Sequence, residues 1–286
     1  MVGDDTARSV FQSEFRNPNS AIEKSSMSRP RILILRAPGT NCDSETAFAF
    51  ERAGGLPEVL HLNRLLEAPR LAAEYQVLCI PGGFSYGDDV AAGRIFANQI
   101  RHHLGDVLAE FRAANKLVLG ICNGFQVLMK SGLLDTDDPQ GPAASLSWNE
   151  SGRYVDRWVH LCTDGSKCVF LAGVERMFLP IAHAEGQFVA RNEESLKQLL
   201  QAGQLVLRYE AAGGEGDAGS AADGYNPNGS MADVAGMCDT TGRVFGMMPH
   251  PERFIDPTHH PQWTRLPPQQ AGDGLQLFRN AVRYFS

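Results

Sequence analysis

The chain has 286 residues, of which 43% are hydrophobic and 21% are charged. A chain of this length and hydrophobic content buries a sizeable core, so the composition excludes an intrinsically disordered protein. The 26 basic and 33 acidic residues give a net charge of −7, which argues against nucleic acid as the main ligand. No apolar run approaches the roughly 18 residues of a membrane span, and the first residues lack the apolar core of a secretory signal.

The chain contains six cysteines, which are scattered without CxxC pairs: Cys42, Cys79, Cys122, Cys162, Cys168 and Cys238. In a long chain with no secretory signal, we expect reduced thiols and a cytoplasmic location. No spacing of Cys and His residues assembles the three or four ligands of a metal site, so we expect no metal. At least one of these reduced thiols can then have a chemical role.

Taken in chain order, the pattern begins with a tail over 1–28, which shows no sustained periodicity and is predicted to be disordered. A single catalytic domain is predicted over 29–286. Its first part is expected to contain strand 31–36, helix 44–54 with Ser44 as N-cap, strand 57–62, a helical stretch over 65–75, strand 76–80, helix 90–114, strand 116–121 and helix 123–130. This alternation predicts βαβ units and a mostly parallel sheet with helices on both faces.

The pattern changes after Leu134. Strands are predicted at 157–162, 204–210 and 243–248, with few helices between them, and an amphipathic helix over 274–284 closes the chain. The segments 211–224 and 256–273 are predicted to be exposed loops. No internal repeat is present, and no break divides the domain in two.

The most specific motif is Gly120-Ile121-Cys122-Asn123-Gly124, at the junction of a predicted buried strand and a helix. A nucleophile elbow has this form, because the turn is so tight that residues flanking the nucleophile must be small. The turn places Cys122 at the carboxyl edge of the sheet and at a helix N-terminus, which lowers a thiol pKa. The motif predicts a nucleophilic Cys122. A buried cysteine between two structural glycines is the alternative.

A thiol nucleophile needs a base, and the base needs a group that orients it. The string GMMPHPER (246–253) supplies His250 and Glu252 just beyond a predicted strand. Two residues apart on an extended stretch, these side chains point the same way. The imidazole can therefore face Cys122 while the carboxylate supports its other nitrogen. A surface His-Glu pair in a proline-rich loop is the alternative.

A third motif, IPGGFSYGDD (80–89), also follows a predicted strand. The glycine pair Gly82 and Gly83 exposes backbone N–H groups that can hold a developing oxyanion, and the N–H of Asn123 supplies a second donor in an elbow enzyme. An ordinary βα turn accounts for the same glycines equally well.

Together, GICNGFQ, PGGFSYGD and MMPHPER resemble the class I glutamine amidotransferases, which have a flavodoxin-like α/β fold and a Cys-His-Glu triad. RAPGTNCD (36–43), IAHAEG (181–186) and NPNGS (226–230) make the chain similar, within that family, to the glutaminase subunits of phosphoribosylformylglycinamidine synthase, over about 31–253.

The resemblance implies that the chain hydrolyses glutamine to glutamate and ammonia. Cys122 would attack the amide, His250 would protonate the departing ammonia and Glu252 would hold the imidazole. Gly83 and Asn123 would stabilise the oxyanion, and Gln126 would help to position glutamine.

The resemblance also implies partners. Ammonia would pass to a larger synthetase subunit that binds ATP and Mg²⁺ and converts formylglycinamide ribonucleotide to formylglycinamidine ribonucleotide in purine biosynthesis, with a small accessory subunit in the complex. No P-loop is present in this chain, so no cofactor is expected here.

HAEG (183–186) corresponds to a loop that contacts the α-amino and α-carboxylate groups of glutamine in related glutaminases. Glu185 is the expected partner of the ammonium and His183 its neighbour, although Ala184 and Gln187 stand where the family is associated with glycine and a basic residue. A purely structural loop is the alternative.

Two other functions remain open at this point. One is a different cysteine-elbow protein of the same fold, of the DJ-1/PfpI type, which does not share the C-terminal His-x-Glu. The other is a catalytically silent subunit that only docks to a synthetase, against which the intact triad residues argue.

Overall fold

The computed structural model describes residues 29–134, 140–164, 167–212 and 224–286. The predicted tail 1–28 and most of the predicted loop 211–224 lie outside the described residues. Within the described ranges, no helix combines the length and the apolar character needed to cross a membrane.

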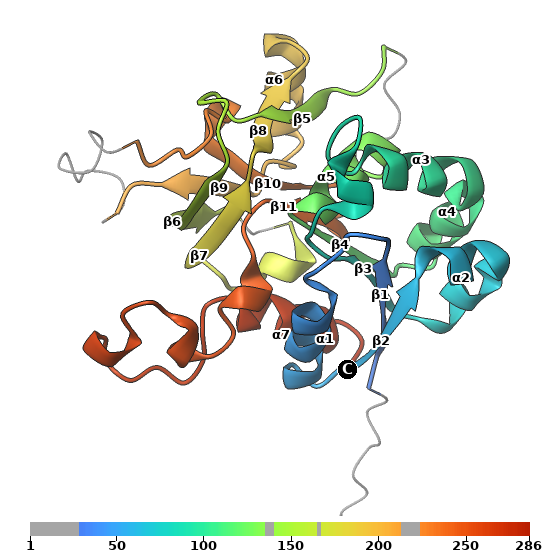
Figure 1. The fold of residues 1–286 in the computed structure, drawn as a ribbon, viewed down its shortest axis with the longest axis horizontal. Helices are drawn as coiled ribbons and strands as arrows, with labels where there is room; N and C mark the ends of the chain where they lie inside the picture. The colour runs from blue at the N-terminus through green and yellow to red at the C-terminus, as the bar shows by residue number, and fades with distance from the viewer. Residues whose placement is uncertain (1–28, 135–139, 165–166, 213–223) are drawn as a thin grey trace, which may run out of the picture.

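The half of the molecule that contains Cys122 is built on parallel strands, as the alternating pattern predicted (Figure 1). These strands lie in the order β2-β1-β3-β4-β11 and are β1 (Arg31–Arg36), β2 (Leu56–His61), β3 (Val77–Ile80), β4 (Leu117–Ile121) and β11 (Val244–Met247). β3, β4 and β11 are buried along their whole length, which explains their continuous apolar sequences. Because β1 pairs with both β2 and β3, the strand order reverses there, and such a reversal opens a ligand crevice at the carboxyl ends of the strands.

The same nine-stranded sheet continues from β11 through antiparallel strands in the order β10-β9-β6-β7. These are β10 (Val234–Cys238), β9 (Leu207–Glu210), β6 (Val155–Thr163) and β7 (Arg176–His183), and a separate two-stranded sheet pairs β5 (Ala144–Trp148) with β8 (Glu185–Ala190). β6, β9 and β11 confirm the three strands predicted after Leu134. The sequence did not predict β7, which contains Pro180; a proline is tolerated there because β7 is the edge strand.

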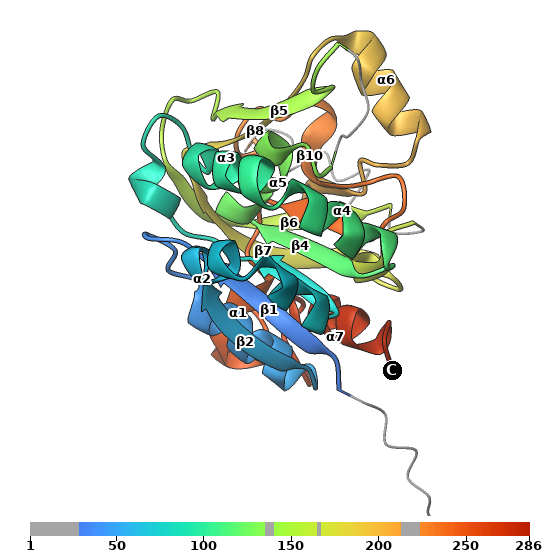
Figure 2. The same ribbon diagram turned by 90° about the vertical axis from the view of Figure 1, so that its right-hand side faces the viewer.

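Helices cover both faces of the parallel strands, which confirms the predicted α/β class (Figure 2). α1 (Asp43–Arg52) and α7 (Leu275–Arg283) pack together on one face, and α3 (Arg94–His103), α4 (Gly105–Ala113) and α5 (Asn123–Ser131) lie on the other. The remaining helices are α2 (Leu62–Glu67) and α6 (Glu193–Gln201). The sequence did not predict α6, whose N-cap Asn192 accepts a hydrogen bond from the backbone of Ser195 at 2.8 Å.

Two helix predictions were wrong in detail. The predicted helix 90–114 is two helices, because the backbone leaves the helical region at Leu104 and α3 begins only after Gly93, which has a left-handed φ of 70°. Ser44 is not the N-cap of α1. The helix begins one residue earlier, after Cys42, and no side chain caps it.

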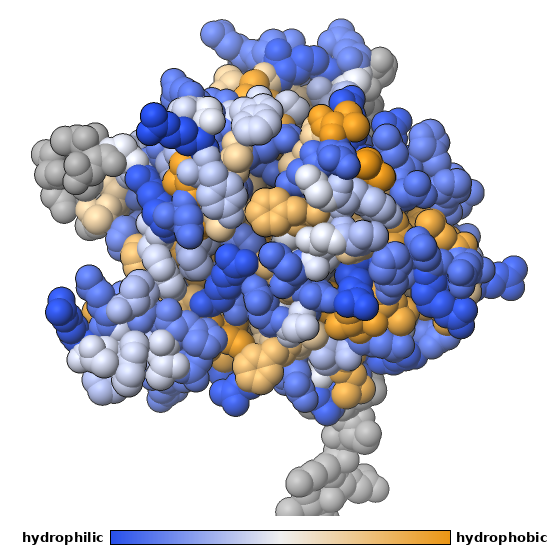
Figure 3. Space-filling model, viewed as in Figure 1, coloured by the Kyte–Doolittle hydropathy of each residue, from blue (hydrophilic) through white to orange (hydrophobic). Residues whose placement is uncertain are grey.

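The surface of the molecule is mostly polar. The face in Figure 3 is mostly hydrophilic, and its hydrophobic side chains lie in separate small patches. The predicted loop 256–273 is exposed over residues 261–270 and contains two short 3₁₀ turns. The strand order therefore makes the carboxyl ends of the parallel strands the place to look for a ligand site.

Candidate active site

Cys122 occupies the turn between β4 and α5, where the motif placed it. Its backbone adopts φ 50° and ψ −105°, a region that non-glycine residues rarely occupy, so the surrounding structure must hold it there. Gly124 permits the tight turn, because a Cβ at this position would lie 1.9 Å from the carbonyl oxygen of Ile80. The predicted strand, turn and helix are therefore all present.

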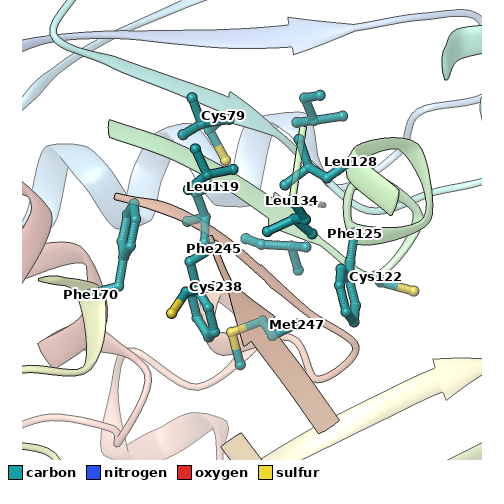
Figure 4. Close-up of a cluster of buried hydrophobic side chains, with 14 of the residues drawn as sticks. Cys79, Leu119, Cys122, Phe125, Leu128, Leu134, Phe170, Cys238, Phe245 and Met247 are labelled. Atoms are coloured by element: carbon teal, nitrogen blue, oxygen red, sulfur yellow. The ribbon is translucent and has the colours of Figure 1, made fainter. Parts of the chain in front are cut away.

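The thiol of Cys122 lies at the margin of the hydrophobic core. Figure 4 shows its sulfur directed away from the neighbouring side chains of the cluster, whereas Cys79 and Cys238 lie within it. Cys122 is 5% exposed, and its thiol donates a weak hydrogen bond to the carbonyl of Ala182 at 3.8 Å. Cys122 immediately precedes α5 and so lies at the positive end of the helix dipole.

His250 and Glu252 follow β11, the parallel neighbour of β4. Both side chains are buried, and Nδ1 of His250 lies 2.6 Å from Oε1 of Glu252. Burial lowers the pKa of His250, but the charge of Glu252 and the contact with the Cys122 thiol outweigh it and raise the pKa well above the usual value. Among the described residues, Nε2 of His250 has no hydrogen-bond partner, so it is available to a reacting group.

The local backbone around this pair differs from the extended stretch that the sequence predicted. His250 is extended, but Pro251–Arg253 form a 3₁₀ turn. The tight turn brings the carboxylate back to the imidazole two residues earlier, so the predicted contact forms by a different local route.

The glycine pair after β3 is held by the loop after β1. Gly83 forms a β-bridge with Thr40, and the N–H of Phe84 donates to the carbonyl of Gly39 at 3.0 Å. Gly83 has a φ of 140°, and a Cβ there would lie 2.7 Å from the backbone nitrogen of Asn41, so only glycine fits. None of the backbone carbonyls in the described residues accepts the N–H of Gly83.

Asn123 connects this loop to the nucleophile helix. Its backbone N–H is in the first turn of α5, where no intrahelical acceptor exists. Its side-chain oxygen accepts a hydrogen bond from the hydroxyl of Ser85 at 2.6 Å, and its amide nitrogen donates to Oε1 of Gln126 at 2.9 Å. Gln126 in turn donates to the backbone carbonyl of Glu185.

A cavity of about 190 Å³ brings several predicted residues together. Five of them line it: Gly83, Cys122, Gln126, His183 and Glu185. The other four, which are Gly82, Asn123, His250 and Glu252, adjoin these residues but do not line the cavity. A larger cavity of about 460 Å³ lies beside α4 and contains none of the predicted residues, so volume alone does not identify the site.

The two residues of the HAEG motif differ in how they are used. Nδ1 of His183 contacts Oδ1 of Asn149 at 3.0 Å, and burial, with the charge of His250, lowers the pKa of His183 to about 3. The amide nitrogen of Asn149 already donates to two carbonyls, so its oxygen must be the acceptor and His183 Nδ1 carries the proton. Both carboxylate oxygens of Glu185 have partners within the protein, which the sequence did not predict.

Comparison with known proteins places this geometry in a family. Residues 29–285 match the family model of the CobB/CobQ-like glutamine amidotransferase domain. The chain belongs to this family. It is 43% identical to the phosphoribosylformylglycinamidine synthase subunit PurQ of Dehalococcoides mccartyi, covering 90% of this chain and 98% of the relative, and 40% identical to that of Methanococcus maripaludis, with the same shares covered.

Solved structures of other proteins share the fold of this chain. The structure of PurLQS from Thermotoga maritima contains a chain with 30% identity and a TM-score of 0.67, matched over 90% of this chain and 100% of that one. A glutamine amidotransferase from Thermotoga maritima has 14% identity and a TM-score of 0.53 over 90% of this chain and 98% of that one, which supports the fold alone.

The amidotransferase site also contains a thiol whose surroundings the sequence did not reveal. Cys42 is a buried thiol in the loop after β1. Its Sγ, a ring nitrogen of His250 and a carboxylate oxygen of Glu252 all lie within 4.8 Å of one another. The guanidinium of Arg253 donates to this sulfur at 3.2 Å. A fixed positive charge at this distance disfavours a cation, so we interpret the cluster as support for the imidazole.

Two charged residues of the cavity region were also missed. Lys130, on α5, lies 2.6 Å from Glu185, and Asp88, which lines the cavity, accepts a hydrogen bond from Asn123 at 3.0 Å. The string GDD (87–89) contained the only signal for Asp88. No sequence signal marks Lys130, because 55 residues separate it from its partner.

Proposed function

We propose that this chain is the glutaminase subunit of phosphoribosylformylglycinamidine synthase, acting in the cytoplasm in purine biosynthesis. The observation that carries the proposal is the convergence of an elbow thiol, Cys122, with a buried His250–Glu252 pair on neighbouring parallel strands. The amidotransferase family and the PurQ relatives support the same function.

In the proposed mechanism, the sulfur of Cys122 attacks the side-chain amide carbon of glutamine and His250 takes the thiol proton. The imidazolium returns that proton to the amide nitrogen as the C–N bond breaks, which releases ammonia and leaves a thioester. His250 then removes a proton from water, which attacks the thioester and releases glutamate. Glu252 keeps the imidazole oriented and stabilises its charged form, consistent with the raised pKa of His250.

The oxyanion of each tetrahedral intermediate is assigned to the backbone N–H groups of Gly83 and Asn123. Their availability and their position beside Cys122 support this assignment. Gln126 and His183 are assigned to substrate positioning in the cavity, and Gly82 to close packing behind the imidazole, where a Cβ would lie 2.7 Å from Cε1 of His250. Glu185 is assigned to the wall of the substrate cavity.

The ammonia would pass to a larger synthetase subunit, which supplies the ATP and Mg²⁺ chemistry, with a small accessory subunit in the same complex; this chain itself needs no cofactor. The T. maritima complex supports such an assembly. Three exposed apolar side chains, Phe84, Val90 and Trp148, line the cavity and offer a surface for the partner.

The test is glutamate release from glutamine, measured with and without the synthetase subunit. We expect Cys122→Ala to abolish release, whereas the control Cys162→Ala, at a partly buried thiol in β6, retains it. Free ammonia should still support the synthetase in the presence of the Cys122 variant. Equal release by wild type and Cys122→Ala would refute the nucleophile and leave a docking role.

A further inference from the structure

The glutamine that this site is proposed to bind carries an α-ammonium group, and a cation in a partly closed cavity needs an anionic partner. Two carboxylates line the cavity, Asp88 and Glu185. The resemblance to related glutaminases implied Glu185 as that partner. The contacts of the two residues favour Asp88 instead.

Glu185 is already neutralised within the protein. Its Oε1 lies 2.6 Å from Nζ of Lys130, and its Oε2 accepts the backbone N–H of Ala92 at 3.0 Å. Lys130 is anchored as well, because it also donates to the carbonyl of Ala92 at 2.6 Å. A substrate ammonium at Glu185 would have to compete with a lysine held in place, which leaves little net attraction.

Asp88 takes part in none of the ion pairs among the described residues. Its Oδ1 accepts a hydrogen bond from the side chain of Asn123 at 3.0 Å, and the charge of Lys130 that acts on it belongs to an ammonium already paired with Glu185. Burial, together with the charge of Glu185, raises the pKa of Asp88, and the hydrogen bonds from Gly93 and Asn123 and the charge of Lys130 offset this only in part. His183 in the same cavity cannot supply the missing cation, because its pKa is about 3 and it stays neutral.

Asp88 and Cys122 line the same cavity, so one ligand can reach both side chains. Its carboxylate is fixed by Asn123, the residue next to the nucleophile. The α-nitrogen of glutamine is four bonds from the amide carbon, a reach of about 5 Å. The segment that carries Asp88 is held in an unusual backbone, with φ 55° at Tyr86, 54° at Asp88 and 71° at Val90, so its direction is set by the surrounding structure.

We propose that Asp88, rather than Glu185, binds the α-ammonium of glutamine and thereby selects an amino-acid substrate. The inference rests on the proposed glutaminase function and adds a specificity-determining residue to it. It separates the two carboxylates by role: Glu185 ties α5 to the cavity wall through Lys130, and Asp88 meets the substrate.

The experiment removes the α-amino group of the substrate and the carboxylate of Asp88 separately. Glutaramate is glutamine without its α-amino group, so kcat/KM is measured for both compounds in the complex with the synthetase subunit. We expect Asp88→Asn to lower kcat/KM for glutamine by about 10- to 100-fold, mainly through KM, and to leave glutaramate hydrolysis unchanged. The control is Asp89→Asn at the exposed neighbouring position, which should alter neither value.

Three results would overturn the inference: an equal loss for both substrates, no loss for glutamine, or a loss of discrimination in Glu185→Gln but not in Asp88→Asn. Calorimetry with the Cys122→Ala protein separates this inference from the catalytic proposal, because it needs no turnover. If glutamine binds that protein more tightly than glutaramate, and adding Asp88→Asn removes the difference, the assignment of Asp88 holds even if Cys122 proves not to be the nucleophile. Equal affinities before and after Asp88→Asn would reject it.

Discussion

Gly82 offers a direct test of how closely the imidazole of His250 is packed. It does not have a left-handed backbone, so alanine is conformationally allowed there. The added Cβ, however, would lie 2.7 Å from Cε1 of His250 and 3.2 Å from Sγ of Cys42. Contacts become ordinary at 3.4 Å, so the ring must shift by about 0.7 Å, the difference between 3.4 and 2.7 Å.

Such a shift strains the 2.6 Å contact between His250 and Glu252 and moves Nε2 relative to Cys122. Because a misplacement of roughly 1 Å can cost about 10²-fold in rate, we expect Gly82→Ala to lower kcat/KM for glutamine by about 10- to 100-fold. Glutamate release in the presence of the synthetase subunit measures the effect, and thermal unfolding shows whether the fold is kept.

The matched control is Gly105→Ala. Gly105 is the first residue of α4, and a Cβ there meets nothing within 4 Å, so activity should be unchanged. If Gly82→Ala retained wild-type kcat/KM, the imidazole would have room to relax without losing its alignment. The assigned packing role of Gly82 would then be wrong.

Three further predictions follow from the same contacts. Glu252→Gln keeps the side-chain shape but removes the anionic acceptor, so kcat/KM should fall by about 10²- to 10⁴-fold, and a wild-type rate across the pH profile would contradict the triad. His183 has a folded pKa of about 3, below the unfolded 6.5, so its contribution to stability is complete above pH 6.5 and is lost as pH falls. The free energy of unfolding is measured by chemical denaturation at pH 7 and pH 5. Between these pH values His183→Asn should lose about 2 kcal/mol less of it than the wild type, whereas His102→Gln, at an exposed position, should lose as much as the wild type. Equal losses in the wild type and both variants would reject this prediction. Gly246→Ala would place a Cβ 2.1 Å from the ring of Phe125 and should lower the free energy of unfolding by about 1–3 kcal/mol, and full stability in a denaturant titration would show that the ring can move.

The parts of the site that depend on neighbours along the chain could be predicted from the amino-acid sequence. The elbow at Cys122 was predictable because a strand-to-helix turn this tight requires small flanking residues, and Gly124 meets that requirement. The contact between His250 and Glu252 was predictable because the two residues lie so close along the chain, although the predicted stretch was extended and the structure has a 3₁₀ turn there. The alternation of strands and helices likewise indicated the α/β class before any tertiary contact was known.

The contacts of charged groups and thiols that lie far apart in the sequence could not be predicted, because they depend on how the strands and loops pack. The pairing of β4 with β11 brings His250 to Cys122, and the loop after β1 brings Cys42 to Arg253, 211 residues away. Lys130 and Glu185 pair across 55 residues, a contact that no local motif indicated. The physical reason is that a side chain's charge state and availability depend on what packs against it, and that is settled by sheet order and loop docking rather than by spacing along the chain.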